Sequence, residues 1–145
     1  MNVEQKQYDE MVKQVSPKSA VFMNSIKAFF VGGIICAIGQ VLYNFFEARG
    51  FSQENTGILV ASVLITVAIL LTALGLYERI GKFAGAGSVV PITGFANAIA
   101  APAIEHKKEG LVLGVGAKMF VIAGPVIVYG TVTSVIVGII YYFVR

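Results

Sequence analysis

One lysine stands where a charge is hardest to accommodate. Lys118 is the only charged residue in an apolar stretch that covers residues 111–144. A lysine at the centre of a bilayer costs roughly 3 kcal/mol on insertion scales. Its amine must therefore contact a polar cavity or an anion, pair with a partner, or reach the membrane surface along its flexible stem. The first two roles make Lys118 a candidate residue of a solute path, and the last is purely structural.

Uncharged polar side chains recur one helical turn apart in two other segments. Thr93 and Asn97 are four residues apart, and so are Gln40 and Asn44. This spacing places both members of each pair on one face of a helix. Such side chains either line a water-filled path or form hydrogen bonds between helices. The sequence leaves both interpretations open for these four candidates.

Catalytic and metal-binding motifs are not visible in the sequence. The chain has one histidine, His106, and one cysteine, Cys36, so neither a metal site with recognisable ligand spacing nor an internal disulfide is predicted. The segment GVGAK at 114–118 lacks the four-residue gap and the Gly-Lys-Ser/Thr ending of a phosphate-binding loop. We therefore expect a protein that is not an enzyme and that needs no metal or cofactor.

The elements that must position these residues are apolar. Hydrophobic residues make up 57% of the 145-residue chain and charged residues only 13%, whereas a soluble domain carries roughly 25% charged residues. The mean hydropathy is +0.80. There are too few charges to cover a water-facing surface, and the apolar residues come in runs, so we predict an all-α integral membrane protein. The net charge of +3 forms no extended basic patch that would suggest nucleic acid as a partner.

Three membrane spans are predicted from the uncharged runs. Residues 28–46 and 57–77 contain no charge, and 19 residues of helix measure roughly 28 Å against a hydrocarbon thickness of ~30 Å. A third span is expected at about 126–144, after Gly124–Pro125 separates it from a half-helix that carries Lys118.

The first 27 residues are polar and are predicted to form an N-terminal segment at the membrane surface. Ser16–Pro17 is typical of a helix start, and this helix is expected to run into the first span. The tail contains four lysines and the first loop contains only Arg49. The positive-inside rule therefore predicts a cytoplasmic N-terminus.

The region 83–123 is predicted to be broken or re-entrant. Glycines and prolines interrupt its uncharged first part, at Gly85, Gly87, Pro91, Gly94 and Pro102. Such a backbone is tolerated in a bilayer only where protein buries it or where it lines water. We expect a helix from about Ile92 to Lys107. The alternative counts 83–104 and 111–129 as complete spans, so the prediction is three to four transmembrane helices.

Small residues at a spacing of four are the candidates for helix packing, because they let helices approach closely in lipid. Three lie in the last span, at Gly130, Ser134 and Gly138, and Gly32 starts a similar series in the first span. Gly110 and Gly114 form another pair. Packing within the chain is favoured over contact with another subunit, and both remain open.

Three strings carry a resemblance to a known family. They are FAGAGSVVPITGFANAIAAPAIEHKKEG at 83–110, GVGAKMFVIAGPVIVYG at 114–130 and YDEMVKQVSPKS at 8–19. Together they cover much of the chain, which resembles the AC branch of the SpoVA family of stage V sporulation proteins. The resemblance assigns no individual pore residue.

The resemblance implies a channel subunit in the inner membrane of the forespore and spore. Its solute would be dipicolinic acid with calcium, passed during sporulation and germination, and the channel would respond to membrane tension. The implied partners are other SpoVA subunits, namely a related small membrane protein and a soluble dipicolinate-binding subunit, in a homo- or hetero-oligomer. The alternative is a structural membrane subunit that assembles the complex while a partner forms the pore.

Overall fold

The computed structural model describes residues 7–8, 10–12 and 20–144, and between residues 20 and 144 it is helical without a strand. This confirms the predicted all-α class. The predicted helix start at Ser16–Pro17 lies outside the described residues. The elements are α2 (Val21–Glu47), α3 (Gln53–Ala73), α4 (Leu76–Ala84), α5 (Ala86–Val89), α6 (Ile92–Glu105), a 3-10 turn (His106–Glu109), a π-helical segment (Leu111–Gly116) and α7 (Ala117–Val144).

Three helical stretches of the described chain are long and apolar enough to cross a membrane. They cover Val21–Glu47, Gln53–Ala73 and Leu111–Val144. The first begins seven residues before the predicted start at 28, because the polar side chains of its first two turns do not prevent helix formation. The second ends at Ala73, four residues before the predicted end at 77.

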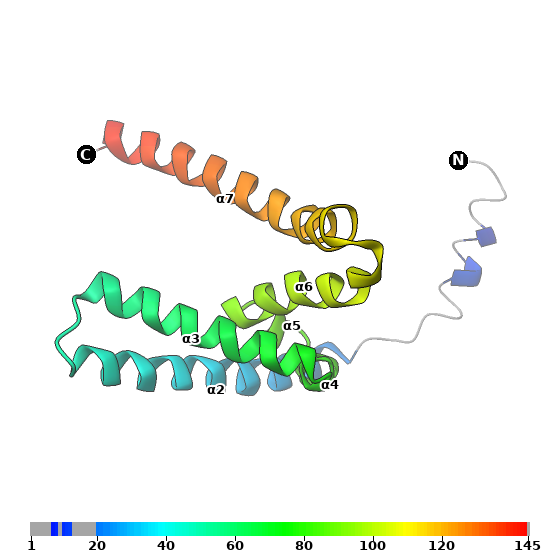
Figure 1. The fold of residues 1–145 in the computed structure, drawn as a ribbon, viewed down its shortest axis with the longest axis horizontal. Helices are drawn as coiled ribbons and strands as arrows, with labels where there is room; N and C mark the ends of the chain where they lie inside the picture. Colours follow the sequence, from blue (N-terminus) through cyan, green and yellow to red (C-terminus); the bar gives the residue numbers. More distant parts are fainter. Residues whose placement is uncertain (1–6, 9, 13–19, 145) are drawn as a thin grey trace.

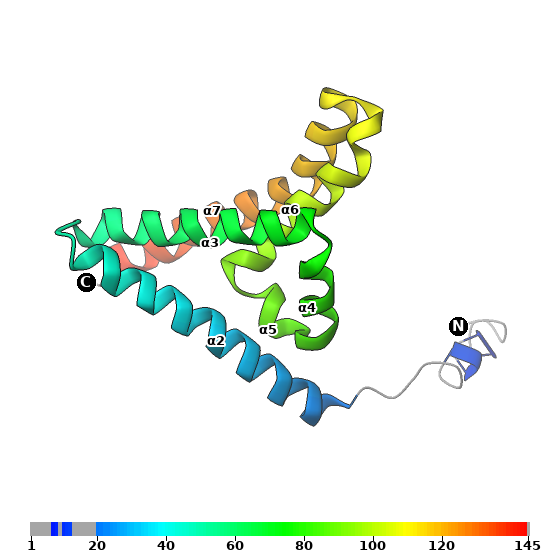
Figure 2. The same cartoon turned by 60° about the horizontal axis from the view of Figure 1, so that its bottom comes forward.

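Helices α2 and α3 form a hairpin whose arms diverge from the connecting turn (Figure 2). Near the closed end they approach at Gly39, where an added Cβ would lie 3.7 Å from a methyl of Leu64. Toward the open end, α5 packs against α2 and α6 packs against α3. The segment α5–α6 is thus a wedge between the two arms.

Helix α4 is an amphipathic helix that turns away from the end of α3 (Figure 2). Gly75 adopts φ +69°, the left-handed conformation that ends a helix and that glycine adopts at low cost. The uncharged run continues past this turn into Tyr77, which is why a count of charges alone overestimates the length of α3. Tyr77 and Ala84 of α4 are buried, whereas its charged residues Glu78 and Lys82 are exposed. This division is typical of a helix at the membrane surface.

The wedge α5–α6 is the predicted broken segment, and the structure confirms the break. The chain breaks at Gly85, with φ +53°, where α4 gives way to α5, and again at Val90–Pro91 between α5 and α6. Helix α6 begins at Ile92 in the middle of the helical body and returns toward the end where α4 lies (Figure 1). Because α6 has 14 residues, it measures about 21 Å and is shorter than the ~30 Å hydrocarbon core. Residues 83–104 therefore do not form one continuous span, as the alternative interpretation required.

Helix α7 runs without interruption from Ala117 to Val144 and contains Pro125. The predicted division at Gly124–Pro125 is wrong. A proline in a helix frees only one carbonyl, here that of Val121, and membrane helices tolerate such a loss. The third apolar stretch is one helical unit of 34 residues from Leu111, and it leads away from the wedge so that the C-terminus lies opposite the start of α2 (Figure 1).

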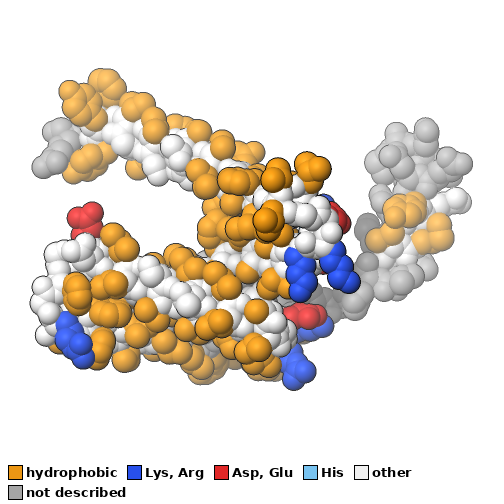
Figure 3. Space-filling model, viewed as in Figure 1, with side chains coloured by type: hydrophobic (Ala, Val, Ile, Leu, Met, Phe, Trp, Pro, Cys, Tyr) orange, Lys and Arg blue, Asp and Glu red, His pale blue; other side chains and the backbone are white. Residues whose placement is uncertain are grey.

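Charged side chains gather at the two ends of the molecule, and apolar side chains cover the surface between them (Figure 3). One end carries the turn between α2 and α3, with Arg49 as its cation. The other end carries α4, the 3-10 turn and the start of α2, with Lys27, Arg79, Lys82, Lys107 and Lys108. The Lys27 amine lies 5.2 Å from the centre of the Phe83 ring and so joins α2 to α4.

Candidate functional site

A buried hydrogen-bond cluster closes the break in the wedge. The Tyr77 hydroxyl donates to the Ser88 carbonyl at 2.8 Å and is hydrogen bonded to the Thr93 hydroxyl at 3.0 Å. All three residues are buried. The Ser88 carbonyl lies at the point where α5 ends, so it needs a partner that the helix does not supply. Tyr77 of α4 therefore links α5 to α6 by hydrogen bonds across the break.

Asn97 lies one turn beyond Thr93 and anchors α6 to α3. Its side-chain oxygen lies 2.9 Å from the Thr72 hydroxyl, which is also 2.7 Å from the Ala68 carbonyl. Thr93 and Asn97, which were predicted to share a helix face, thus both bind neighbouring elements. The contact with Thr72 does not exclude contact of Asn97 with a solute, because Asn97 also borders a cavity.

That cavity lies between α3, α4 and α6, at the end of the molecule that carries most cations. Its volume is about 320 Å³, and it is lined by Thr72, Gly75, Glu78, Asn97, Ala101, Ile104 and Glu105. We call it the Asn97 cavity. Glu78 and Glu105 give it a polar side and Asn97 also borders it, so it is the best candidate among the described residues for the mouth of a solute path.

The electrostatics of the Asn97 cavity favour positive or neutral solutes. Glu78 forms an ion pair with Lys82 at 2.6 Å. The hydrogen bond from Lys82 and its positive charge lower the pKa of the Glu78 carboxyl below its usual value. Glu78 is consequently ionised at neutral pH and its charge is largely balanced by Lys82. Glu105 has no ion-pair partner among the described residues and contributes a negative charge to the opening.

Lys118 lies in the first turn of α7 and is half-buried. It makes no hydrogen bond or ion pair within residues 20–144. Side chains of a helix point back toward its N-terminus, and here the apolar π-helical segment and then the charged 3-10 turn precede α7. The amine can therefore reach the membrane surface along its stem, and the structure does not join Lys118 to Asn97 by any polar contact.

Gln40 and Asn44 lie on the exposed side of α2. The amide nitrogen of Gln40 donates to the side-chain oxygen of Asn44 at 2.8 Å. The pair is separate from the Asn97 cavity and satisfies only part of its own hydrogen-bonding capacity. The remaining amide groups are available to a neighbouring subunit or to water.

A close helix contact joins Gly87 of α5 to α2. A Cβ added to Gly87 would overlap the carbonyl oxygen of Ala28 and would lie 2.7 Å from its Cα atom. A Cβ on Gly32 would lie 3.3 Å from the Gly87 carbonyl oxygen. Ala28 and Gly32 are one turn apart, so together with Gly87 they form the close approach of small residues that lipid-embedded helices use.

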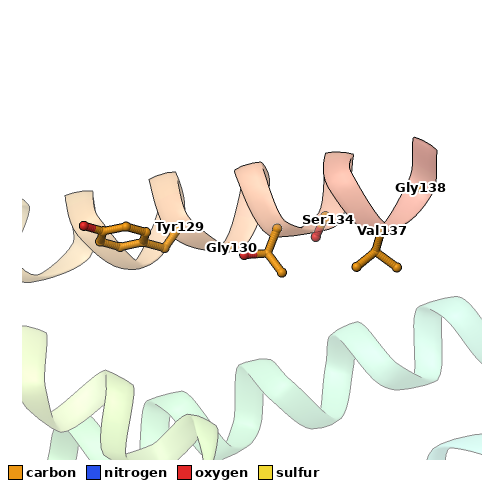
Figure 4. A pocket seen from close by; sticks show the side chains of 6 residues that line it. Tyr129, Gly130, Ser134, Val137 and Gly138 are labelled. Carbon is orange, nitrogen blue, oxygen red and sulfur yellow. The ribbon is translucent and has the colours of Figure 1, made fainter. Parts of the chain in front are cut away.

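The other predicted packing residues lie in different surroundings. Gly114 is close to the backbone of the 3-10 turn, where a Cβ would overlap the His106 carbonyl. Gly110 adopts φ +95° and serves the turn itself. Gly130 and Gly138 have no described atom within 4 Å of an added Cβ. With Ser134 they line an open face of α7 that looks toward the rest of the chain across a gap (Figure 4).

Sequence reasoning missed Tyr77 and Ser88. Tyr77 was counted as the last residue of a span, although its position just after Gly75 and just before Glu78–Arg79 is a signal for the start of a surface helix. Ser88 gave no signal, because it acts through its backbone carbonyl and its side chain bonds only the Gly85 carbonyl.

A diverging hairpin, a re-entrant wedge and a third long apolar helix define a multi-pass α-helical membrane protein. Residues 24–140 match the family described as SpoVAC/SpoVAEB sporulation membrane protein, and the chain belongs to that family. It is 52% identical over 136 residues to "Stage V sporulation protein AC" of Bacillus subtilis (strain 168), across 93% of this chain and 91% of that protein. No solved structure matches the chain.

Proposed function

We propose that this sporulation membrane protein is a conduit subunit through which dipicolinic acid passes together with calcium. The observation that carries the proposal is the re-entrant wedge α5–α6, whose backbone is broken at Gly85 and at Val90–Pro91. In a bilayer such a break is stable only against protein or water. Broken helices that meet near the membrane midplane are the usual element of solute paths in transporters.

The charges of the Asn97 cavity favour passage of the solute as a neutral complex. Dipicolinate carries two negative charges, and a calcium ion balances both. The free dianion would be repelled by the carboxylate of Glu105, which has no ion-pair partner among the described residues. The complex meets no such barrier, and its calcium is already chelated, so no calcium site is needed in the protein.

The proposal places the chain in the inner membrane of the forespore and spore. The end with Lys27, Arg79, Lys82, Lys107 and Lys108 faces the cytoplasm under the positive-inside rule, and so does the N-terminus. A soluble dipicolinate-binding subunit would meet the Asn97 cavity at this end. The related small membrane subunit would contact the exposed faces of α2 and α7.

Replacement of Asn97 by leucine is expected to lower the flux of calcium dipicolinate at least tenfold in the assembled complex. Among the described residues that line the cavity, Asn97 carries the one amide side chain, and the change replaces it with an apolar side chain. The measurement is solute release from vesicles that contain the purified complex. Asn55→Leu makes the same chemical change at an exposed position in the first turn of α3 and should retain wild-type flux. Equal flux in Asn97→Leu with intact assembly would remove Asn97 from the path.

The second candidate function is that of a structural subunit that assembles the complex while a partner forms the pore. The exposed stripe Gly130, Ser134 and Gly138 favours it, since small residues in lipid invite a partner helix. Recordings from vesicles that contain only this protein, with tension applied, separate the two functions. Currents support the conduit, and silence in well-folded preparations supports the structural subunit.

A further inference from the structure

The tip of the wedge, where α5 ends and α6 begins, exposes two apolar side chains. Val89 and Val90 are 67% and 82% exposed. Ser88 before them and Thr93 after them are buried, and both are bonded to Tyr77. Helix α6 begins in the middle of the helical body and returns toward the end where α4 lies (Figure 1). The two valines, which we call the valine tip, therefore lie near the middle of the membrane.

The backbone at the valine tip lacks hydrogen-bond partners among the described residues. Helix α6 follows Pro91 without a side-chain cap, and the amide of its first residue, Ile92, has no acceptor. The amides of residues 94 and 95 both donate to the Pro91 carbonyl, so the Val90 carbonyl has no donor. Each backbone group that stays unpaired in lipid costs several kcal/mol. Lipid is therefore an unfavourable neighbour for the tip.

Water can satisfy these backbone groups, whereas an apolar helix of another subunit cannot. The backbone of a helix is hydrogen bonded within itself, so such a helix offers the tip neither a donor nor an acceptor. Water is available in the conduit proposed above, on which this inference rests. The Asn97 cavity, the candidate mouth of that conduit, borders the C-terminal half of α6, and the valine tip lies at the other end of the same helix.

We propose that Val89 and Val90 form a hydrophobic gate in the path of the solute. Constrictions lined by apolar side chains close a pore by losing their water. Single waters that bond the Val90 carbonyl and the Ile92 amide do not form a continuous column. A continuous column must also wet both valine side chains, which costs free energy. In the closed state the column is therefore interrupted at the valine tip, and calcium dipicolinate passes only when the tip is wetted.

The contact between α5 and α2 couples the valine tip to a membrane span. Gly87 lies two residues before Val89, and a Cβ added to it would overlap the carbonyl oxygen of Ala28 in α2. A stretched bilayer becomes thinner, and spanning helices tilt in response. Tilting of α2 would therefore move the tip and change the width of the constriction.

The test makes the valine tip polar. Val90→Asn lowers the cost of wetting the constriction, so it should open the path and not block it. We expect the release of calcium dipicolinate from vesicles that contain the purified complex to rise roughly tenfold without applied tension. Val90→Ile keeps the tip apolar and should leave the path closed. Val128→Asn makes the same polar change on α7, where Val128 is 58% exposed, and should also leave it closed.

The outcomes separate the gate from the conduit. If the wild-type complex conducts under tension and Val90→Asn vesicles are as tight as wild-type vesicles without it, the gate is overturned and the conduit stands. If both complexes are silent under tension, the gate and the conduit are both overturned. Leakage of Val128→Asn equal to that of Val90→Asn would show that a polar residue disturbs the assembly wherever it is placed, and the gate would again be overturned.

Thiol labelling keeps the inference testable if Val90→Asn does not assemble. Cys36 is the only cysteine of the chain, so Val90→Cys combined with Cys36→Ala carries a single reactive thiol. A membrane-impermeant cationic methanethiosulfonate should modify this thiol roughly tenfold faster under tension, when water fills the tip. Val128→Cys in the same background places its thiol in lipid and should stay unmodified in both conditions. Equal rates at position 90 with and without tension would contradict the gate.

Discussion

Gly87→Ala is expected to destabilise the protein by about 3 kcal/mol, at the upper end of the effects of overpacking. The added methyl would overlap the Ala28 carbonyl oxygen, which is backbone and cannot rotate away. Either α5 moves off α2 or α2 bends, and both changes open the wedge. Gly87 does not have a positive φ, so alanine meets no conformational penalty there and the whole effect comes from the contact.

Gly33→Ala is the control for this prediction. Gly33 lies on the exposed side of α2 with no described atom within 4 Å of an added Cβ. Alanine is favoured over glycine in a helix by about 1 kcal/mol, so Gly33→Ala should be neutral or stabilising. The free energy of unfolding of both variants is measured in bicelles by steric trapping. Equal stability of the two would mean that α5 does not contact α2 as closely as the structure shows.

Tyr77→Phe should cost about 2 kcal/mol, the free energy of leaving a buried polar group without its hydrogen bond. The ring and its packing remain, and only the hydroxyl is lost. The Ser88 carbonyl then has no partner at the break between α5 and α6, and the Thr93 hydroxyl loses its bond as well. The effect should exceed that of the same change at a surface tyrosine, because water cannot replace the missing donor in the bilayer.

Two further variants serve as controls for Tyr77→Phe. One is Tyr129→Phe, and the other is the double variant Tyr77→Phe with Thr93→Val. Tyr129 is 74% exposed, so its hydroxyl should contribute little. In the double variant the cost should be less than the sum of the two single changes, because both remove the same bond. Strictly additive costs, or a Tyr77→Phe variant as stable as the wild type, would show that the hydroxyl cluster does not hold the wedge.

The class of the fold could be predicted because it follows from simple features of the sequence. Long uncharged runs have one stable arrangement in lipid, and glycine and proline cannot continue a lipid-facing helix at low cost. These rules predicted the membrane class, the broken segment and the start of α6 at Ile92. They failed at Pro125, because a single proline removes only one hydrogen bond and a 28-residue helix absorbs that loss.

The candidate site was only partly predictable. Thr93 and Asn97 stood out as polar residues at helical spacing, and both take part in polar contacts around the wedge. Their partners Thr72 and Tyr77 come from other elements, and spacing along one helix carries no information about them. The importance of Gly87 rests on its contact with Ala28, 59 residues earlier in the chain, which no local pattern reveals.

The start of α2 and the end of α7 lie at opposite ends of the molecule (Figure 1). If the three long apolar helices each cross once, the start of α2 and the end of α7 lie in different compartments, so reporters inserted before α2 and after α7 should signal from different aqueous phases. In the orientation proposed above, a cytosolic ligand would meet the end that carries α4 and the 3-10 turn, whereas an effector in the other compartment would meet the 48–52 turn and the far end of α7. Any assembly in which all copies of this subunit share one orientation consequently presents unlike surfaces to the two compartments.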